Sequence, residues 1–486
     1  MLLAVVTASI VPRALGPATY GNYNFLLSTS AAIRGFLDNG TQQAFFTFSS
    51  QTRVSGPLTK LYALALSGQF AITLTLIGLA AATGKIDWLW RGQRLDQVVL
   101  VTALDWTLFL ALSLQQLGDT KGRTIYPQLA AAAVSMLTLA GLLALRFTRT
   151  LDFYTFAWLN LGGAVLTCFV LSFRLIGRHR AQVWDGDTAF RGYVQRWWRF
   201  TRPLILLQYY FAVVAYLGLY LIQRWYGSEE LGFYSLALQW SAFAMVFTTS
   251  GVSIFWREIA YSAAQDLRHT AKTYEQFSKI FFFLSLVLSC GLSAGSSLLV
   301  QVVAGPRFSA AAKVLAIMAF YPISQTINQL TVASMKATER TGSYARWSFI
   351  LSVPELLLTY ILLAPAAAAV PGLHLGATGM AIKTAVYGLL AAQVYDWVNC
   401  KFFGISYMAA LARKAIAAAI VGTVAVLIFG AGASWLQRQT YSNLGALCAA
   451  ACAYVIAIGM IVVLWPSLAG VTREQIRQGV RLSSRR

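Results

Sequence analysis

The stretch VPRALGPATYGNYNFLLS, residues 11–28, interrupts an apolar segment with Arg13, two prolines and two glycines before the chain becomes apolar again. A related stretch, IQRWYGSEELGFYSLAL, occupies residues 222–238. Both stretches are short polar breaks between long apolar blocks. The spacing of such blocks therefore decides the fold class.

The composition excludes an ordinary soluble protein. Apolar residues make up 58% of the 486 residues, charged residues make up 11%, and the mean hydropathy is +0.61. A soluble domain has about 25% charged residues. The apolar blocks are about 20 residues long, which is the length of helix needed to cross a hydrocarbon core of about 30 Å. The sequence thus predicts an all-α polytopic membrane protein.

About fourteen spans are expected along the chain. The first covers only twelve residues, which reach about 18 Å as a helix, so we expect the true start to lie upstream of Met1. The expected spans are 1–12, 22–46, 58–82, 93–116, 124–146, 152–176, 203–223, 232–257, 277–303, 311–334, 345–364, 373–396, 409–430 and 444–464.

The distribution of Lys and Arg predicts the orientation. If the N-terminus is cytoplasmic, the inner breaks and the C-terminal tail carry 26 of the 38 Lys and Arg residues, and the outer breaks carry 10. This excess follows the positive-inside rule, so both termini are expected to be cytoplasmic. It also accounts for the net charge of +21 without nucleic acid as a partner.

An internal repeat indicates two related halves. Arg13-Ala14-Leu15-Gly16 aligns with Arg224-Trp225-Tyr226-Gly227, and at the same offset Gly21-Asn22-Tyr23 aligns with Gly232-Phe233-Tyr234. Parallel repeats of this kind enclose a substrate site between them. The predicted organisation is an N-terminal six-helix lobe (1–176), a basic cytoplasmic linker (177–202), a second six-helix lobe (203–396), two additional transmembrane helices (397–464) and a basic cytoplasmic tail (465–486).

The repeated turn has a physical explanation. Gly16 and Gly227 can end a helix in the left-handed conformation, and Pro17 blocks continuation of the first helix. Arg13 and Arg224 lie at helix ends, where a long cationic side chain reaches the interface easily. They are either interfacial anchors or residues of an outer gate.

Several segments resemble a known family. RALGPATYGNY (13–23), FLDNG (36–40), AGPRFSAAAKVLAIMAFYPISQTINQLTVASMKATERT (304–341) and FFGISYMAALARKAIAAAI (402–420) are similar to segments of the polysaccharide-repeat flippases. Those proteins form part of the multidrug/oligosaccharidyl-lipid/polysaccharide exporter superfamily. The resemblance implies two lobes around a central cavity in the bacterial inner membrane, and outward movement of undecaprenyl-diphosphate-linked oligosaccharide. The short first helix departs from the family pattern.

Charged residues inside the spans are the candidate site, because such residues are costly in a membrane and usually face a cavity or a partner. Arg34 and Asp38 are four residues apart and can pair on one helix face, and Lys383 can pair with Glu355 on the preceding span. One cation in each half at similar depth is also what a diphosphate requires. We therefore expect Arg34 and Lys383 to bind the diphosphate, and Asp38, Asp105 or Glu355 to take up a coupling ion.

The remaining features narrow the function classes. No P-loop is present, and the three histidines are scattered, so neither ATP hydrolysis nor a catalytic or metal site is expected. No cofactor is expected from the sequence, and coupling of transport to H⁺ or Na⁺ is possible. A non-enzymatic flippase is the favoured interpretation, acting with the polymerase and glycosyltransferases of its pathway. The alternatives are a cation-coupled multidrug exporter and a membrane polysaccharide polymerase or ligase.

Overall fold

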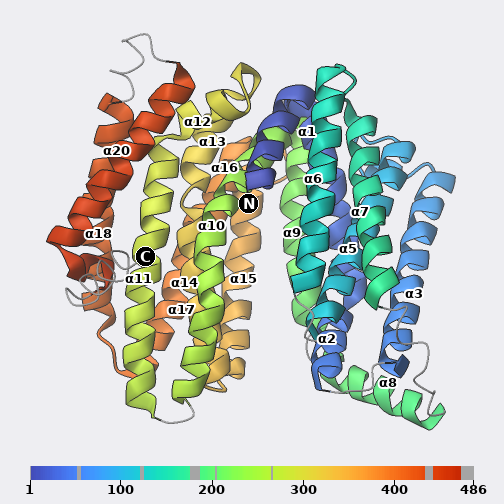
Figure 1. Cartoon of the computed structure of the whole chain (residues 1–486), viewed down its shortest axis with the longest axis horizontal. Helices are drawn as coiled ribbons and strands as arrows, with labels where there is room; N and C mark the ends of the chain where they lie inside the picture. Colours follow the sequence, from blue (N-terminus) through green and yellow to red (C-terminus); the bar gives the residue numbers. More distant parts are fainter. Residues whose placement is uncertain are drawn as a thin grey trace. The chain divides into compact units, whose positions relative to one another are not determined.

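The structure is a computed structural model that describes residues 2–51, 56–120, 125–175, 187–202, 205–263, 266–432 and 442–471. Throughout these residues the secondary structure is helical, and they contain no strand (Figure 1). The chain divides into two compact units, Met1–Gly232 and Phe233–Arg486. The prediction of an all-α fold is confirmed.

The first unit follows most of the expected spans closely. Its helices are α1 (Leu2–Asp38), α2 (Thr41–Gln51), α3 (Gly56–Ala82), α4 (Ile86–Leu89), α5 (Leu95–Thr120), α6 (Ile125–Phe147), α7 (Phe153–Leu175), α8 (Asp187–Thr201), α9 (Ile205–Trp225) and the start of α10 (Ser228–Ala263). The first two expected spans are joined as α1, which bends at one residue and is followed by α2.

The bend in α1 lies at Gly16, where φ is 76° and ψ is 167°. The equivalent Gly227, between α9 and α10, has a φ of 82°. Residues with a side chain rarely adopt positive φ, whereas glycine does so without steric cost. The φ of Gly227 agrees with the expected left-handed conformation, whereas the ψ of Gly16 lies outside the left-handed helical region, so the expectation is wrong for Gly16.

Helix α5 lies at the centre of the first unit, where it packs against α1 and α7. Val101 and Leu104 on α5 and Phe25 and Leu26 on α1 are fully buried. In a membrane such packing stabilises the fold through van der Waals contacts, because lipid is as apolar as the side chains themselves. This packing holds the middle of α5 rigidly against the second half of α1, which is where the charged residues of this unit occur.

The second unit contains the remainder of α10 and all later helices. These are α11 (Leu267–Ala294), α12 (Ser296–Val303), η2 (Pro306–Phe308), α13 (Ala311–Met318), α14 (Tyr321–Ala337), α15 (Thr341–Leu363), α16 (Gly376–Ile382), η3 (Lys383–Tyr387), α17 (Gly388–Phe403), α18 (Tyr407–Val426), η4 (Leu427–Gly432), α20 (Asn443–Leu464) and η5 (Pro466–Ala469). Its largest core cluster joins α11 to α18 and α20 through residues such as Leu286, Val421 and Tyr454.

Eight helices of the described chain are long and apolar enough to cross a membrane: α3, α5, α6, α7, α11, α15, α18 and α20. Other expected spans correspond to shorter helices in series, such as α13 followed by α14. The chain is a multi-pass membrane protein, and the count of about fourteen spans stays a prediction.

The unit boundary differs from the predicted domain boundary. The sequence assigned residues 203–223 to the second lobe, whereas α9 belongs to the first unit because it packs along α1. Residues 187–201 of the expected linker form the helix α8. The rest of the linker up to residue 186, and residues 472–486 of the expected tail, lie outside the described residues.

Candidate functional site

A buried ion pair joins α1 to α5 in the first unit. The Nε of Arg34 donates to Oδ2 of Asp105 at 2.9 Å, and its Nη2 donates to Oδ1 at 3.2 Å. The guanidinium also lies 4.2 Å from the centroid of the Phe109 ring. Two parallel hydrogen bonds and a ring contact fix the orientation of the guanidinium, as bidentate arginine pairs do.

The two partners of this pair differ in accessibility. The Arg34 side chain is 20% exposed, and that of Asp105 is 7% exposed. Asp105 is ten residues from the first residue of α5, which places it about 15 Å along the helix. The pair therefore lies at mid-depth of the span, and its cation is the group that a ligand can reach more easily.

The intrahelical pair of Arg34 with Asp38 that the sequence allowed is replaced by this interhelical pair. Asp38 is the last residue of α1, and its Oδ1 accepts a hydrogen bond from the backbone N–H of Gln42 at 3.2 Å. A carboxylate near the N-terminus of the next helix, α2, is stabilised by the helix dipole. The role of Asp38 in ion coupling stays a prediction.

A second ion pair joins α15 to the start of η3 in the second unit. The Nζ of Lys383 lies 2.7 Å from Oε1 of Glu355, a pair that the sequence allowed. Here the cation is the more buried partner, with 9% of its side chain exposed against 26% for Glu355. Each unit thus contains, near the middle of a span, a cation paired with a carboxylate.

Lys383 opens a π-helical segment, Lys383–Tyr387, between two α-helical turns. Single π turns inside helices are rare and often mark functional sites, because they redirect side chains. The hydroxyl of Tyr387 at the end of this segment donates to the carbonyl of Leu351 on α15. This bond ties the widened turn to the helix that carries Glu355.

A hollow of about 530 Å³ lies between α1 and α9 in the first unit. Its α1 wall consists of small residues within two helical turns: Ser28, Ala31, Ala32 and Gly35. Its α9 wall includes the amide side chain of Gln208. This volume is typical of small-ligand sites. The hollow runs past the turn of α1 that carries Arg34.

The outer-gate candidates lie at exposed helix ends. Arg13 precedes the bend of α1, and Arg224 lies in the last turn of α9. Both side chains are exposed, and Nη1 of Arg224 donates to the hydroxyl of Tyr220 at 3.3 Å. These positions suit interfacial anchors, and their role in a gate stays a prediction.

The sequence repeat forms a reciprocal backbone contact that the sequence alone did not reveal. A Cβ added at Gly21 would lie 1.8 Å from the carbonyl oxygen of Ser228, and a Cβ added at Gly232 would lie 2.1 Å from that of Pro17. In the sequence repeat Ser228 is equivalent to Pro17 and Gly232 is equivalent to Gly21, so the two contacts join equivalent residues in opposite order. The start of α10 and the second half of α1 therefore cross in a two-fold-like arrangement that only glycine permits.

Polar side chains fasten this crossing. The hydroxyl of Ser228 donates to Oδ1 of Asn22 at 2.5 Å, and Nε2 of Gln93 donates to the same oxygen at 2.7 Å. Nε2 of Gln223 donates to the Ser228 hydroxyl at 3.0 Å. Hydrogen bonds between polar side chains hold membrane helices together when the backbones approach closely.

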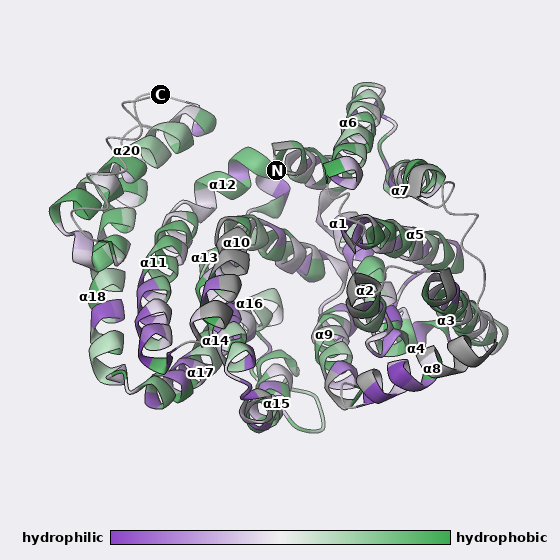
Figure 2. Ribbon diagram, turned by 60° about the horizontal axis from the view of Figure 1, so that its bottom comes forward, coloured by the Kyte–Doolittle hydropathy of each residue, from purple (hydrophilic) through white to green (hydrophobic). Residues whose placement is uncertain are grey.

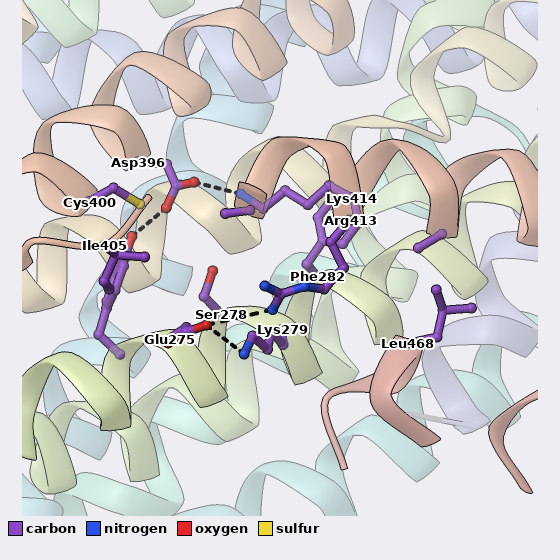
Figure 3. A pocket seen from close by; sticks show the side chains of 13 residues that line it. Glu275, Ser278, Lys279, Phe282, Asp396, Cys400, Ile405, Arg413, Lys414 and Leu468 are labelled. Carbon is purple, nitrogen blue, oxygen red and sulfur yellow. Dashed lines mark hydrogen bonds and ion pairs between the residues drawn. The ribbon is translucent and has the colours of Figure 1, made fainter. Parts of the chain in front are cut away.

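A further charged cluster lies in the second unit (Figure 3). The Nζ of Lys414 on α18 lies 2.6 Å from Oδ2 of Asp396 on α17, and the hydroxyl of Tyr274 on α11 donates to Oδ1 at 2.6 Å. Figure 3 shows Lys279 and Arg413 pointing toward Glu275 at the same place. Sequence reasoning missed this cluster because Asp396 and Lys414 lie near the ends of their expected spans.

We expect this cluster to hold α18 on the rest of its unit. The side chains of Asp396 and Lys414 are 2% and 10% exposed, so Lys414→Met leaves a buried carboxylate without its cation. Such a change should lower the free energy of unfolding by about 3–5 kcal/mol. Thermal unfolding in detergent measures this loss. Asp396→Asn/Lys414→Met should recover most of it, and an unchanged unfolding temperature for Lys414→Met would show that the pair is not structural.

Arg340 ties the turn between α14 and α15 to α17. Its Nη2 donates to Oδ1 of Asn399 at 2.6 Å, and its guanidinium lies 3.6 Å from the centroid of the Phe402 ring. Burial lowers the pKa of Arg340 to about 10, so the side chain is still protonated at neutral pH. This turn belongs to the segment SMKATERTGSY, residues 334–344.

The fold is shared with membrane transporters. The structure resembles a lipid II flippase, MurJ, in an inward-closed conformation, with a TM-score of 0.67, 12% identity and coverage of 95% of this chain and 96% of that chain. It also resembles an inward-facing multidrug resistance MATE family transporter of the MOP superfamily, with a TM-score of 0.61, 14% identity and coverage of 83% and 93%. A Vibrio cholerae MATE transporter, VcmN, gives a TM-score of 0.50 at 14% identity, covering 85% and 98%.

The fold and the charges inside the spans thus define the class: a multi-pass membrane protein with the fold of the multidrug/oligosaccharidyl-lipid/polysaccharide exporter superfamily. A model of the polysaccharide biosynthesis protein family matches residues 10–313. The chain belongs to this family. No curated protein matches it in sequence.

Proposed function

We propose that the protein is a flippase that moves undecaprenyl-diphosphate-linked oligosaccharide across the bacterial inner membrane, from the cytoplasmic to the outer side. Membership of the polysaccharide biosynthesis family and a fold like that of the lipid II flippase support this proposal. The oligosaccharide would serve as a repeat unit of O-antigen, capsule or exopolysaccharide. Transport of this kind needs no covalent chemistry.

One observation carries the proposal: each unit holds a cation inside its spans, paired with a single carboxylate. A diphosphate cannot remain in a low-dielectric cavity without compensating charge. Arg34 can bind a phosphate through two hydrogen bonds, as it now binds Asp105, and Lys383 can provide a second positive charge. A cavity that binds only cationic drugs would not need these cations.

We infer an exchange of partners as the mechanism. The diphosphate binds Arg34 and Lys383 in the inward-open state and displaces Asp105 and Glu355. Each displaced carboxylate must then be neutralised, since an unpaired charge is costly inside the membrane. Uptake of one H⁺ or Na⁺ by each carboxylate, Glu355 and the less exposed Asp105, would supply this neutralisation. The two lobes then rock about the midplane while the lipid tail stays in hydrocarbon.

Reconstitution into proteoliposomes tests the function. Three labelled substrates are compared: a polyprenyl-diphosphate oligosaccharide, the corresponding monophosphate, and ethidium as a cationic drug. We expect the diphosphate to cross fastest, the monophosphate more slowly, and ethidium at the rate of protein-free vesicles. Ethidium transport without movement of either lipid would instead identify a multidrug exporter.

A further inference from the structure

The first unit contains a second, apolar depression, a groove of about 400 Å³ between α3 and α5. From α3 it is lined by residues that include Tyr62, Ala63 and Ser67, and from α5 by residues from Ala103 to Leu117. Fourteen residues of helix extend about 21 Å, which exceeds half the thickness of the hydrocarbon core, about 15 Å. The groove is therefore long enough to receive a hydrocarbon chain that enters from one leaflet.

The groove opens at the surface of two apolar spans, α3 and α5, whose composition suits a hydrocarbon environment. Ala63 and Ser67 on α3 are exposed, and Leu110 on α5 is 43% exposed. Trp106 and Phe109 form part of its inner wall, and both are buried. A depression on the hydrocarbon-facing surface of a span must be filled by lipid, because a void there loses van der Waals contacts on one side.

The helix α8 lies across the lower ends of α2 and α3 (Figure 1) and packs against both. Trp197 on α8 packs against an apolar cluster that includes Phe45, Tyr62 and Leu117, and these three residues also line the groove. Phe45 and Tyr62 stack with their ring centroids 4.2 Å apart. The interfacial helix and the groove therefore share one wall.

The exposed side chains of α8 beside this cluster are basic and aromatic, and the guanidinium of Arg196 lies 4.6 Å from the centroid of the Phe48 ring at the cluster's edge. Arg196 and Arg199 are exposed, and Trp198 is 53% exposed. Figure 2 shows hydrophilic residues along α8, which contrast with the apolar spans above it. Amphipathic helices with Trp and Arg lie in the headgroup region and attract anionic lipids. By the positive-inside rule this is the cytoplasmic leaflet.

We propose that the groove holds one hydrocarbon chain of an anionic phospholipid of the cytoplasmic leaflet, with the phosphate bound by Arg196 and Arg199. The charge of α8 complements the lipid phosphate, and the groove matches the chain in polarity and length. The proposal does not depend on which substrate the protein transports. The ring of Phe109, which lines the groove and contacts the Arg34 guanidinium at 4.2 Å, connects the bound lipid to the transport site.

Fluorescence quenching tests the position of the chain. The full-length protein is reconstituted with phosphatidylglycerol whose chains are brominated, and the emission of Trp106 is obtained as the difference between wild type and Trp106→Phe. We expect strong quenching of this difference signal. The groove-filling variant Ala63→Leu/Ser67→Phe should reduce the quenching at least twofold. Ala71→Leu, a matched change at an exposed α3 position that does not line the groove, should leave it unchanged.

Two further comparisons decide the headgroup and the source of the lipid. Arg196→Gln/Arg199→Gln should weaken quenching by phosphatidylglycerol severalfold, whereas Arg268→Gln, at an exposed arginine of α11, should have no effect. Equal quenching by brominated phosphatidylcholine, or no response to the α8 variants, would overturn the proposed headgroup contact. Displacement of the phospholipid by equimolar undecaprenyl phosphate would assign the groove to the substrate tail and overturn the proposal. Unchanged quenching in the groove-filling variant would do so as well.

Discussion

Arg34→Gln/Asp105→Asn should fold normally and lose about 10- to 100-fold in the flux of a diphosphate-linked oligosaccharide. Both replacements are close in shape to the native side chains and can still hydrogen-bond to each other. The variant therefore removes two opposite charges without leaving Asp105 unpaired in the membrane. Hydrogen bonds to a charged partner contribute about 1.5–3 kcal/mol, which corresponds to this range in rate. Flux per folded protein in proteoliposomes is the measurement.

The equivalent variant of the second unit, Lys383→Gln/Glu355→Gln, should also lose flux, but by a smaller factor. The Lys383 side chain is 9% exposed and that of Arg34 is 20% exposed, so the ammonium makes fewer direct contacts with a ligand. A lysine also binds phosphate as a point charge and not through a planar fork. Wild-type flux in both double variants, with normal unfolding temperatures, would eliminate the cations as the phosphate site.

Asp105→Asn alone separates binding from turnover. The carboxylate competes with the diphosphate for Arg34, so its removal should tighten binding of a polyprenyl diphosphate severalfold. Turnover should fall at the same time, because the competing carboxylate helps to release the product. Unaltered binding would show that Asp105 has no part in the exchange of partners. If the ion pair were merely structural, its removal would not be expected to raise the affinity and lower the flux in the same variant.

The second large effect concerns the glycine crossing of α1 with the start of α10. Gly21→Val should abolish transport and lower the yield of folded protein, because even its Cβ would lie 1.8 Å from the Ser228 carbonyl oxygen. Backbone atoms cannot move away as a flexible side chain can, so the helices must separate. Gly232→Val should have the same effect, since its Cβ would meet the Pro17 carbonyl oxygen at 2.1 Å. Flux and thermal unfolding of the purified variants are measured together.

A matched glycine provides the control. A Cβ at Gly78, inside α3, meets nothing within 4 Å, so Gly78→Ala should keep full flux. It should also stabilise the helix by about 0.5–1 kcal/mol, the usual difference between the two residues in a helix interior. If Gly21→Val and Gly78→Ala behave alike, close contact at the crossing is not needed for function.

Much of the fold could be predicted from the sequence because hydropathy alone constrains membrane helices. The ends of α3, α6 and α20 agree with the expected spans to within a few residues. The repeat also predicted the positive φ of Gly227, but the expected left-handed conformation is wrong for Gly16. The repeat did not reveal that Gly21 and Gly232 lie against each other's helices. A repeat shows which residues of the two halves are equivalent, but not how their helices pack.

The candidate site shows where sequence reasoning ends. The spacing of Arg34 and Asp38 suggested a local pair, but packing of α1 on α5 brings the more distant Asp105 to the guanidinium. The pair of Lys383 with Glu355 was left open by the sequence, which placed them on successive spans at similar depth, and the structure forms it. Asp396 and Lys414 were overlooked, although two opposite charges on neighbouring apolar segments were a usable signal. The groove beside Trp106 depends on the distance between α3 and α5, which cannot be predicted from the local sequence of either helix.

The most direct test of the account is an experimental structure of the protein with a bound undecaprenyl-diphosphate oligosaccharide. The account predicts that the phosphates lie within hydrogen-bonding distance, about 3 Å, of both Arg34 and Lys383. It also predicts that Asp105 and Glu355 have released these cations. A diphosphate bound elsewhere, with both ion pairs intact in the complex, would contradict it.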